Sequence, residues 1–168
     1  MSERKRINMP IPFTIYDLAA ARITAPYFAQ QNTRMSDFTV GVSYLWQAHF
    51  DCRYAIVADC LILQVQYDGG RYFTYPIGER VDEALTLLEQ HCTESGTPLR
   101  FATVSPAQTQ QLARRYPRTE VHEQRQFFDY VYHYADLATF AGRRYSAHRN
   151  HINQFVKHAP DWQYVPMT

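Results

Sequence analysis

The feature that most constrains the fold is a hairpin signal, Asp68-Gly69-Gly70, set between two runs rich in β-forming residues. Glycine accepts the positive φ of a primed turn, so this triplet predicts a tight connection between antiparallel strands. Residues 61–67 form the predicted strand before the turn, and residues 72–76 form the one after it. A further strand at residues 54–57 joins residues 61–67 through a tight turn at Asp59 and Cys60. The middle of the chain is therefore predicted to be a three-stranded antiparallel meander.

Helical patterns precede this meander and follow it. Residues 17–31 predict a first helix, which we expect Pro26 to bend or divide. Ser36 and Asp37 offer an N-cap for a second helix. After the meander, residues 80–95 repeat apolar side chains at helical spacing, so they predict a third helix that Gly96 and Pro98 terminate.

A fourth helix is predicted to start at Ser105, because Pro106 and Gln108 complete the pattern of a capping box with proline at the first helical position. It runs to about Tyr116. Strands are predicted at residues 99–104 and as a pair over residues 120–131. This order of elements predicts an α+β fold with a central, mainly antiparallel sheet flanked by helices.

Composition limits the function classes. The net charge of +1 excludes a surface that is basic all over, so any contact with nucleic acid or anionic lipid must be local. The three cysteines are odd in number and lack a Cys-x-x-Cys spacing, which argues against a disulfide framework or a structural zinc site. No apolar run follows the charged N-terminus or reaches the length of a membrane span, so we expect a cytoplasmic chain without a transmembrane segment.

One segment departs from the even charge of the chain. No carboxylate occurs between Asp136 and Asp161, where Arg143, Arg144, Arg149 and Lys157 supply four positive charges. Residues 143–159 predict a helix that ends before Pro160. One face of it is apolar, with Tyr145, His148, Ile152, Phe155, Val156 and Ala159.

The candidate site is the polar flank of that predicted helix beside its apolar face. Arginine and amide side chains can together hold phosphate or carboxylate oxygens, so we predict that this flank binds a substrate or a polyanion. The alternative is an ordinary solvated polar face. The candidate residues are Arg143, Arg149, Asn150, Asn153 and Lys157.

Two other patterns have weaker functional meaning. His148 and His151 are three residues apart, but no third ligand and no carboxylate accompany them, so we predict no metal site. Phe128, Tyr130, Tyr132 and Tyr134 alternate as they would on one face of a strand. They could form a stacking platform, although aromatic strand faces more often build a core.

The same region resembles a known family. The run Asp-Tyr-x-Tyr-x-x-x-Asp-Leu-Ala-Thr from Asp129, then Gly-Arg-Arg-Tyr and Arg-Asn-His-Ile-Asn-x-Phe, is similar to the phosphatidylglycerol lysyltransferase C-terminal domain family. Those proteins are longer than this chain and resemble tandem acetyltransferase-type (GNAT-type) folds, distantly similar to the Fem aminoacyltransferases. The resemblance implies an acetyltransferase-like N-terminal domain at residues 1–142. Residues 143–168 would then be a basic helix and tail that lead into a second domain.

The resemblance also implies an activity. The members of that family look like enzymes that transfer an aminoacyl or acyl group, by analogy with lysyl transfer from charged tRNA to a lipid. A tRNA or a phosphate-bearing acceptor would be the partner. We expect half of such a tandem to be inactive alone, because this catalysis depends on positioning two bound substrates.

No cofactor is predicted. The glycine-rich loop with which acetyltransferases hold the pyrophosphate of acetyl-CoA has no counterpart among the six glycines, and Pro106 removes a backbone donor at the best strand-to-helix junction. Catalytic residues and enzymatic activity therefore stay open. The alternative function is a non-catalytic module that binds a partner protein or a polyanion through the basic helix. In either case we expect its apolar face, with Trp162 and Tyr164, to contact a second domain or a second copy of the chain.

Overall fold

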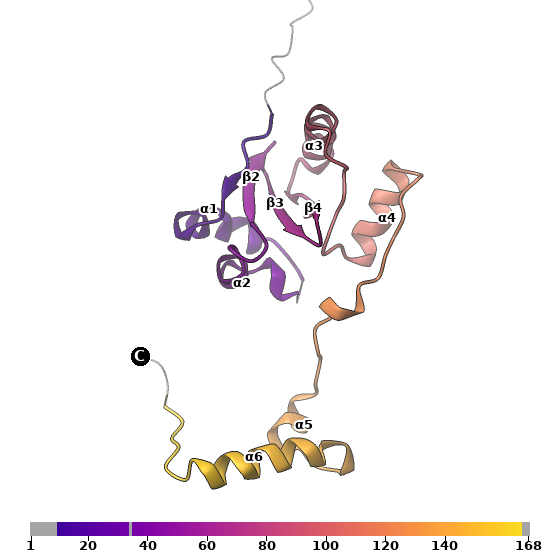
Figure 1. Ribbon diagram of the computed structural model, residues 1–168. Helices are drawn as coiled ribbons and strands as arrows, with labels where there is room; N and C mark the ends of the chain where they lie inside the picture. The colour runs from indigo at the N-terminus through magenta and orange to yellow at the C-terminus, as the bar shows by residue number, and fades with distance from the viewer. Residues whose placement is uncertain (1–9, 34, 166–168) are drawn as a thin grey trace, which may run out of the picture. The chain divides into compact units, whose positions relative to one another are not determined.

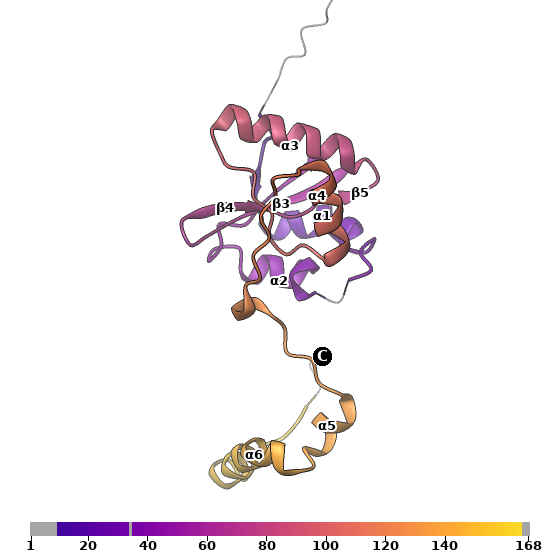
Figure 2. The same ribbon diagram turned by 90° about the vertical axis from the view of Figure 1, so that its right-hand side faces the viewer.

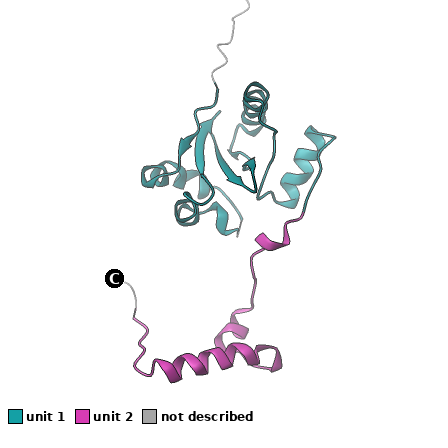
Figure 3. Ribbon diagram, in the orientation of Figure 1, with its two compact units in different colours: residues 1–122 teal, residues 123–168 magenta. Residues whose placement is uncertain are grey.

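The computed structural model describes residues 10–33 and 35–165 (Figure 1). Residues 1–9, Arg34 and residues 166–168 lie outside this description. The chain divides into two compact units, residues 1–122 and 123–168, which are coloured separately in Figure 3. No helix within the described parts of the chain is long and apolar enough to cross a membrane.

Unit 1 is built on an antiparallel sheet, as predicted. Its strands are β1 (Thr14–Ile15), β2 (Arg53–Val57), β3 (Cys60–Tyr67), β4 (Gly70–Phe73) and β5 (Ile77–Gly78). The order is β1-β2-β3-β4, and β5 pairs with β3. In the register, Tyr54 lies opposite Leu63 and Gln64 lies opposite Phe73. The α+β class with a central antiparallel sheet is confirmed.

Two tight turns set this register. Asp68 and Gly69 both have positive φ, 48° and 67°, as the hairpin signal predicted. The β2–β3 turn uses Ala58 and Asp59, at 46° and 58°. It was predicted one residue later, at Asp59 and Cys60, but Cys60 already pairs with Val57 as the first residue of β3.

Helices cover both faces of the sheet. The helices of unit 1 are α1 (Leu18–Phe28), α2 (Val40–Leu45), α3 (Val81–Ser95) and α4 (Pro106–Arg115). Figures 1 and 2 place α1 and α2 on one side of the sheet and α3 and α4 on the other. The side chains of β3 alternate accordingly: Leu61 and Leu63 pack in the core cluster with α1, and Ile62 packs with α3.

The predicted helix ends are mostly confirmed. Ser105 and Gln108 form a complete capping box: the Gln108 amide donates to Ser105 Oγ at 3.3 Å, and the Ser105 amide donates to Gln108 Oε1 at 2.8 Å. Gly96 terminates α3 with φ 65°. Pro26 stays inside α1, which continues to Phe28.

The start of α2 differs from the prediction. Ser36 and Asp37 belong to a short 3-10 helix, η1 (Ser36–Phe38), and neither caps α2. Thr39 is the cap, and its Oγ1 accepts a hydrogen bond from the Val42 amide at 3.3 Å. A threonine hydroxyl and a serine hydroxyl cap helices alike, so the sequence pattern alone did not distinguish them.

Two predicted strand regions are wrong. Residues 99–104 contribute only a parallel bridge between Phe73 and Phe101, although the Phe73 amide does donate to the Arg100 carbonyl at 2.8 Å. Residues 120–131 contain a 3-10 helix, η2 (Arg125–Phe127), and no strand among the described residues. The alternating aromatic residues at 128–134 therefore do not lie on a strand, and Tyr130 is 80% exposed.

Unit 2 is helical. It contains α5 (Tyr134–Thr139), a 3-10 turn η3 (Arg143–Tyr145) and α6 (Ser146–His158). The predicted helix at residues 143–159 is therefore present, with a tighter first turn. The division between the two units falls after His122, and α5 belongs to unit 2, where its residues are hydrogen-bonded to η3 and to the start of α6.

Candidate functional site

The predicted binding flank lies on η3 and α6. Arg143 is in η3, and the other four candidates lie along α6, where residues four apart share one side of a helix. Arg149, Asn153 and Lys157 follow this spacing. The first turn of α6 has no acidic residue, and Lys157 and His158 lie in its last turn. The elements that carry the flank, η3 and α6, therefore contain no carboxylate.

Arg149 does not point into solvent as a free cation. Its Nη1 donates to two backbone carbonyls, that of Phe140 and, at 2.8 Å, that of Gly142. Phe140 ends α5 with a positive φ of 46°, and Gly142 precedes η3 with φ 91°. Arg149 therefore satisfies carbonyls that the turn between α5 and α6 leaves without helical partners. This guanidinium positions the turn, and only part of its donor capacity is left for a ligand.

A small aromatic cluster holds the same turn together. Tyr145 is the one residue of unit 2 that is buried, among those described, and its ring meets Phe140 edge-on at 5.7 Å and His148 at 5.6 Å. His148 also stacks on Phe140 at 5.4 Å, as expected of a residue on the apolar face. Arg144 pairs with Asp136 at 2.5 Å and lies over the Tyr145 ring. Of the four positive charges between Asp136 and Asp161, those of Arg144 and Arg149 therefore stabilise the fold of unit 2.

The other four candidates are available. Arg143, Asn150, Asn153 and Lys157 are exposed, and none of their side chains makes a hydrogen bond or ion pair with another described residue. Arg143 and Lys157 are fourteen positions apart in sequence, which corresponds to about 20 Å along a helix. No single phosphate can touch both. This arrangement suits an extended anion with several charged groups.

The apolar face of α6 is also open within unit 2. Ile152 is 45% exposed and Phe155 is 55% exposed. Trp162 packs beside Phe155, with ring centroids 6.0 Å apart, and is itself half exposed. A helix face of this composition is normally buried in a globular protein.

The histidines do not assemble a metal site among the residues that the structure describes. His148 is part of the aromatic cluster, and His158 Nδ1 lies 2.7 Å from the Gln154 carbonyl of its own helix. His151 is exposed.

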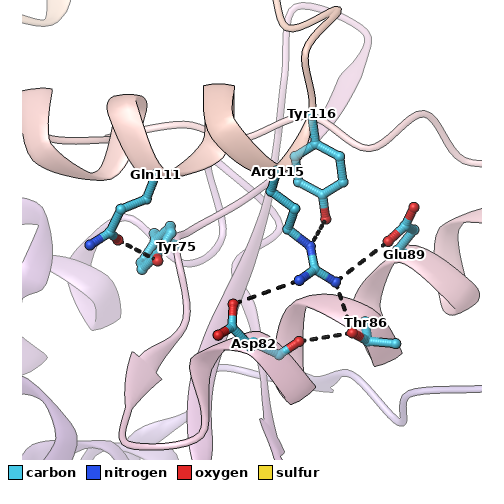
Figure 4. A network of polar contacts seen from close by, with 7 residues as sticks. All are labelled: Tyr75, Asp82, Thr86, Glu89, Gln111, Arg115 and Tyr116. Carbon is cyan, nitrogen blue, oxygen red and sulfur yellow. Dashed lines mark hydrogen bonds and ion pairs between the residues drawn. The ribbon is translucent and has the colours of Figure 1, made fainter.

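A second polar cluster, in unit 1, was not predicted. Arg115, at the end of α4, reaches α3: its Nη2 donates to Thr86 Oγ1 at 2.8 Å, and its guanidinium lies 3.6 Å from Asp82 and 3.7 Å from Glu89 (Figure 4). Its Nε donates to the Tyr116 hydroxyl at 3.0 Å. Burial raises the pKa of that hydroxyl, so it remains a neutral partner of the arginine.

This cluster fastens α4 to α3 and borders a shallow depression of 590 Å³. On its floor the Tyr75 hydroxyl donates to Gln111 Oε1 at 2.6 Å. Each residue drawn in Figure 4 makes at least one of the contacts shown, so the arrangement is that of a structural clamp. No sequence pattern links Thr86 to Arg115, which explains why the clamp was missed.

Comparison with known proteins gives two matches. Residues 28–168 match the family described as phosphatidylglycerol lysyltransferase, C-terminal. Among solved structures, the chain is similar to a conserved protein of unknown function from Bacteroides thetaiotaomicron VPI-5482, with a TM-score of 0.75 and 26% identity. The alignment covers 94% of this chain and 54% of that one, so the chain spans about half the length of that protein. No curated protein matches.

Proposed function

The chain belongs to the phosphatidylglycerol lysyltransferase C-terminal family, and from this premise we propose that it is the N-terminal half of a tandem acetyltransferase-like transferase. The substrates would be an aminoacyl-tRNA and a lipid or similar acceptor. The observation that supports this most directly is the family match over residues 28–168. It is supplemented by the solved protein, in which this fold occupies about half of a longer chain.

In this proposal the fold of unit 1 is the GNAT-type fold, distantly related to the Fem aminoacyltransferases, and the reaction takes place in the cytoplasm. Free, buried thiols at Cys52, Cys60 and Cys92 fit a reducing compartment. Neither the α6 flank nor the Arg115 clamp contains a nucleophile with a neighbouring base. The chain alone therefore supplies binding and orientation, and a second domain has to complete the reaction site.

The α6 flank has a defined role in this scheme. Arg143 and Lys157 contact separate phosphates of the tRNA backbone, or of the acceptor, while Asn150 and Asn153 add neutral hydrogen bonds between them. Arg149 keeps the α5–α6 turn in shape. The apolar face of α6, with Trp162, contacts the second domain, and in its absence it drives formation of a homodimer.

The direct test is an aminoacyl transfer assay with charged tRNA and phosphatidylglycerol vesicles. We expect no transfer by the 168-residue chain. Transfer is expected from a chimeric chain in which the second half of the Bacteroides protein follows Thr168. Transfer by the 168-residue chain alone would show that it is a complete enzyme. Sedimentation of the chain as a stable monomer would contradict the proposed homodimer through the apolar face of α6.

A second function is favoured by the free, carboxylate-free flank: a non-catalytic module that binds a polyanion or a partner protein. For this case, RNA binding should weaken as salt rises, and R143E/K157E should lower the slope of log affinity against log salt by about 2. The variant R114E/R118E, which reverses two exposed arginines of unit 1, is the matched control. RNA binding that survives R143E/K157E but not the control would place the site on unit 1.

A further inference from the structure

The polar side of α6 carries two histidines in addition to the candidate residues. His151 and His158 are exposed, and their spacing of seven positions places them within about 20° of each other around the helix axis. Asn150 and Lys157 form a second exposed row with the same spacing. Gln154 lies between the two rows, three or four positions from each of the other four residues. These five side chains form one continuous exposed surface, which we call the α6 polar face.

The charges around the α6 polar face are mostly positive. Those within η3 and α6 belong to Arg143, Arg144, Arg149 and Lys157. The adjoining helix α5 contributes one carboxylate, Asp136, which Arg144 pairs. The tail after α6 contributes Asp161, three positions beyond His158. The other titratable groups of α5, η3 and α6 are Tyr134, Tyr145 and His148, of which the last two belong to the aromatic cluster.

Both histidines of the α6 polar face can take up a proton at an exposed ring. The Nδ1 atom of His158 lies 2.7 Å from the Gln154 carbonyl oxygen. Because a carbonyl oxygen only accepts, Nδ1 carries a hydrogen and Nε2 is the atom that gains the second one. Histidine side chains change their charge between about pH 8 and about pH 5. Acidification therefore adds up to two positive charges to a surface whose fixed charge comes from Lys157 and the nearby Arg143.

His151 also fills a gap in this surface. Arg143 and Lys157 are about 20 Å apart along the helix, and His151 lies about 12 Å from the first and about 9 Å from the second. An extended anion that reaches both fixed cations passes over the segment that carries His151. Asn150 and Gln154 supply neutral amides on the same segment. The arrangement suits a chain of phosphates better than a single one.

We infer that His151 and His158 are further contacts for the phosphates of single-stranded RNA, which they bind as imidazolium, so that binding strengthens as the pH falls. This inference rests on the proposed function of the α6 flank. RNA is favoured over a lipid surface because the α6 polar face lies opposite Ile152 on the helix. If the apolar side of α6 entered a bilayer, both histidines would point away from the headgroups.

The test is the binding of labelled oligouridine to the 168-residue chain at about pH 7.5 and at about pH 5.5, at constant salt. Uracil and the phosphodiester keep their charges over this range, so the titration is that of the protein. We expect the affinity to rise at least about fivefold at the lower pH. The slope of log affinity against log salt should steepen by about 1.4, which is about 0.7 for each of two new phosphate contacts.

Paired variants locate the effect. H151Q/H158Q should lose most of the gain in affinity on acidification, because glutamine cannot become a cation. The matched control is H122Q/H133Q, which removes two exposed histidines outside α6 and should keep the gain. A gain that survives in H151Q/H158Q, or that disappears equally in H122Q/H133Q, would overturn the inference.

A second measurement needs no variant. In NMR spectra, oligouridine should shift the imidazole resonances of His151 and His158 and raise the pH at which they titrate. This follows from linkage, because a ligand that prefers the imidazolium form favours protonation to the same degree. The resonance of His122 should stay unchanged. Unchanged titration of His151 and His158 in the presence of bound RNA would contradict the assigned contacts.

These outcomes are distinct from those of the proposed function. Oligouridine binding that R143E/K157E abolishes, but that does not change with pH, would keep the flank and exclude the histidines from it. Absence of binding at both pH values would exclude both. Flotation with phosphatidylglycerol vesicles covers the lipid source of phosphate: acid-dependent binding to the vesicles but not to oligouridine would overturn the assignment to RNA.

Discussion

At the scale of single residues, Gly78 is the position where the fold leaves no room for a side chain. A Cβ there would lie 2.5 Å from the Asp59 carbonyl oxygen and 2.9 Å from Cys60 Cα, and φ is 157°. Both contacts are backbone atoms of the β2–β3 turn, so a flexible side chain cannot relieve the clash. We expect G78A to lower the free energy of unfolding by about 1–3 kcal/mol in urea titrations.

The matched control for Gly78 is Gly41, inside α2, where a Cβ would meet nothing within 4 Å. G41A should leave stability unchanged or raise it by up to about 1 kcal/mol, since alanine is the better helix former. Equal losses in the two variants would mean that the clash at Gly78 is relieved by local movement.

His91 links the start of the described chain to α3. Its Nδ1 accepts a hydrogen bond from the Ile11 amide at 3.1 Å, and its ring packs on Phe13 at 5.5 Å. Burial, and then the charge of Arg71, lower the pKa of His91, while Glu94 opposes them. Protonation removes the acceptor. The stabilisation is therefore present above the unfolded-state pKa of about 6.5 and is lost as the pH falls through the folded value.

Accordingly, the free energy of unfolding of the unmodified chain should fall relative to that of H91Q as the pH is lowered from neutral, because glutamine keeps an acceptor that does not titrate. Urea unfolding at several pH values measures this difference. A stability of the unmodified chain that rises relative to H91Q at low pH would contradict the assigned hydrogen bond.

At the scale of elements, Arg149 decides how α5 joins α6. Replacing it with methionine keeps the aliphatic stem but removes the donors to Phe140 and Gly142. R149M should destabilise unit 2 by about 1–3 kcal/mol, the usual range for hydrogen bonds from a charged group. Hydrogen exchange of residues 140–150 should accelerate while unit 1 is unchanged.

K157M is the control for R149M, because Lys157 is exposed on the same helix and its side chain has no polar contact with another described residue. It should leave exchange as it is. If both variants behave alike, the two carbonyl contacts add little to the stability of the turn.

The helices and strands also show which parts of the fold local sequence patterns can predict. The meander, α3 and the capping box of α4 followed from turn residues, periodicity and caps, which act within a few positions of one another. The predicted strand pair at residues 120–131 failed because alternation identifies a strand only where a sheet can accept it. Tyr130 and Tyr134 alternate as they would in a strand, but the described residues of unit 2 contain no strand for them to pair with.

The sequence predicted where the candidate residues lie along the helix but not which contacts they make. Sequence spacing correctly placed Asn150, Asn153 and Lys157 on one exposed side of α6. It could not show that Arg149 turns back to carbonyls seven and nine positions away, or that Arg115 crosses to α3. Such contacts depend on where two elements meet in space.

At the scale of the whole molecule, the hydrophobic core belongs to unit 1. All three clusters of buried apolar residues lie between Tyr16 and Leu112. A chain ending at His122 should therefore fold on its own and unfold at the same urea midpoint as the first transition of the full chain. Circular dichroism and urea titration would show this, and a large drop in the midpoint would mean that residues 123–168 stabilise the sheet.

The three buried thiols can report separately on how the two faces of the sheet open. Cys52 belongs to the cluster on the α1 side of the sheet, and Cys60 and Cys92 belong to the one on the α3 side. Burial raises the pKa of Cys52 to about 12 and of Cys92 to about 11, so neither forms thiolate for alkylation until its surroundings open. Pulsed alkylation followed by peptide mass spectrometry then measures the opening rate on each side of the sheet separately. Equal rates at Cys52 and Cys92 would identify one cooperative opening, and unequal rates would identify the face that loosens first.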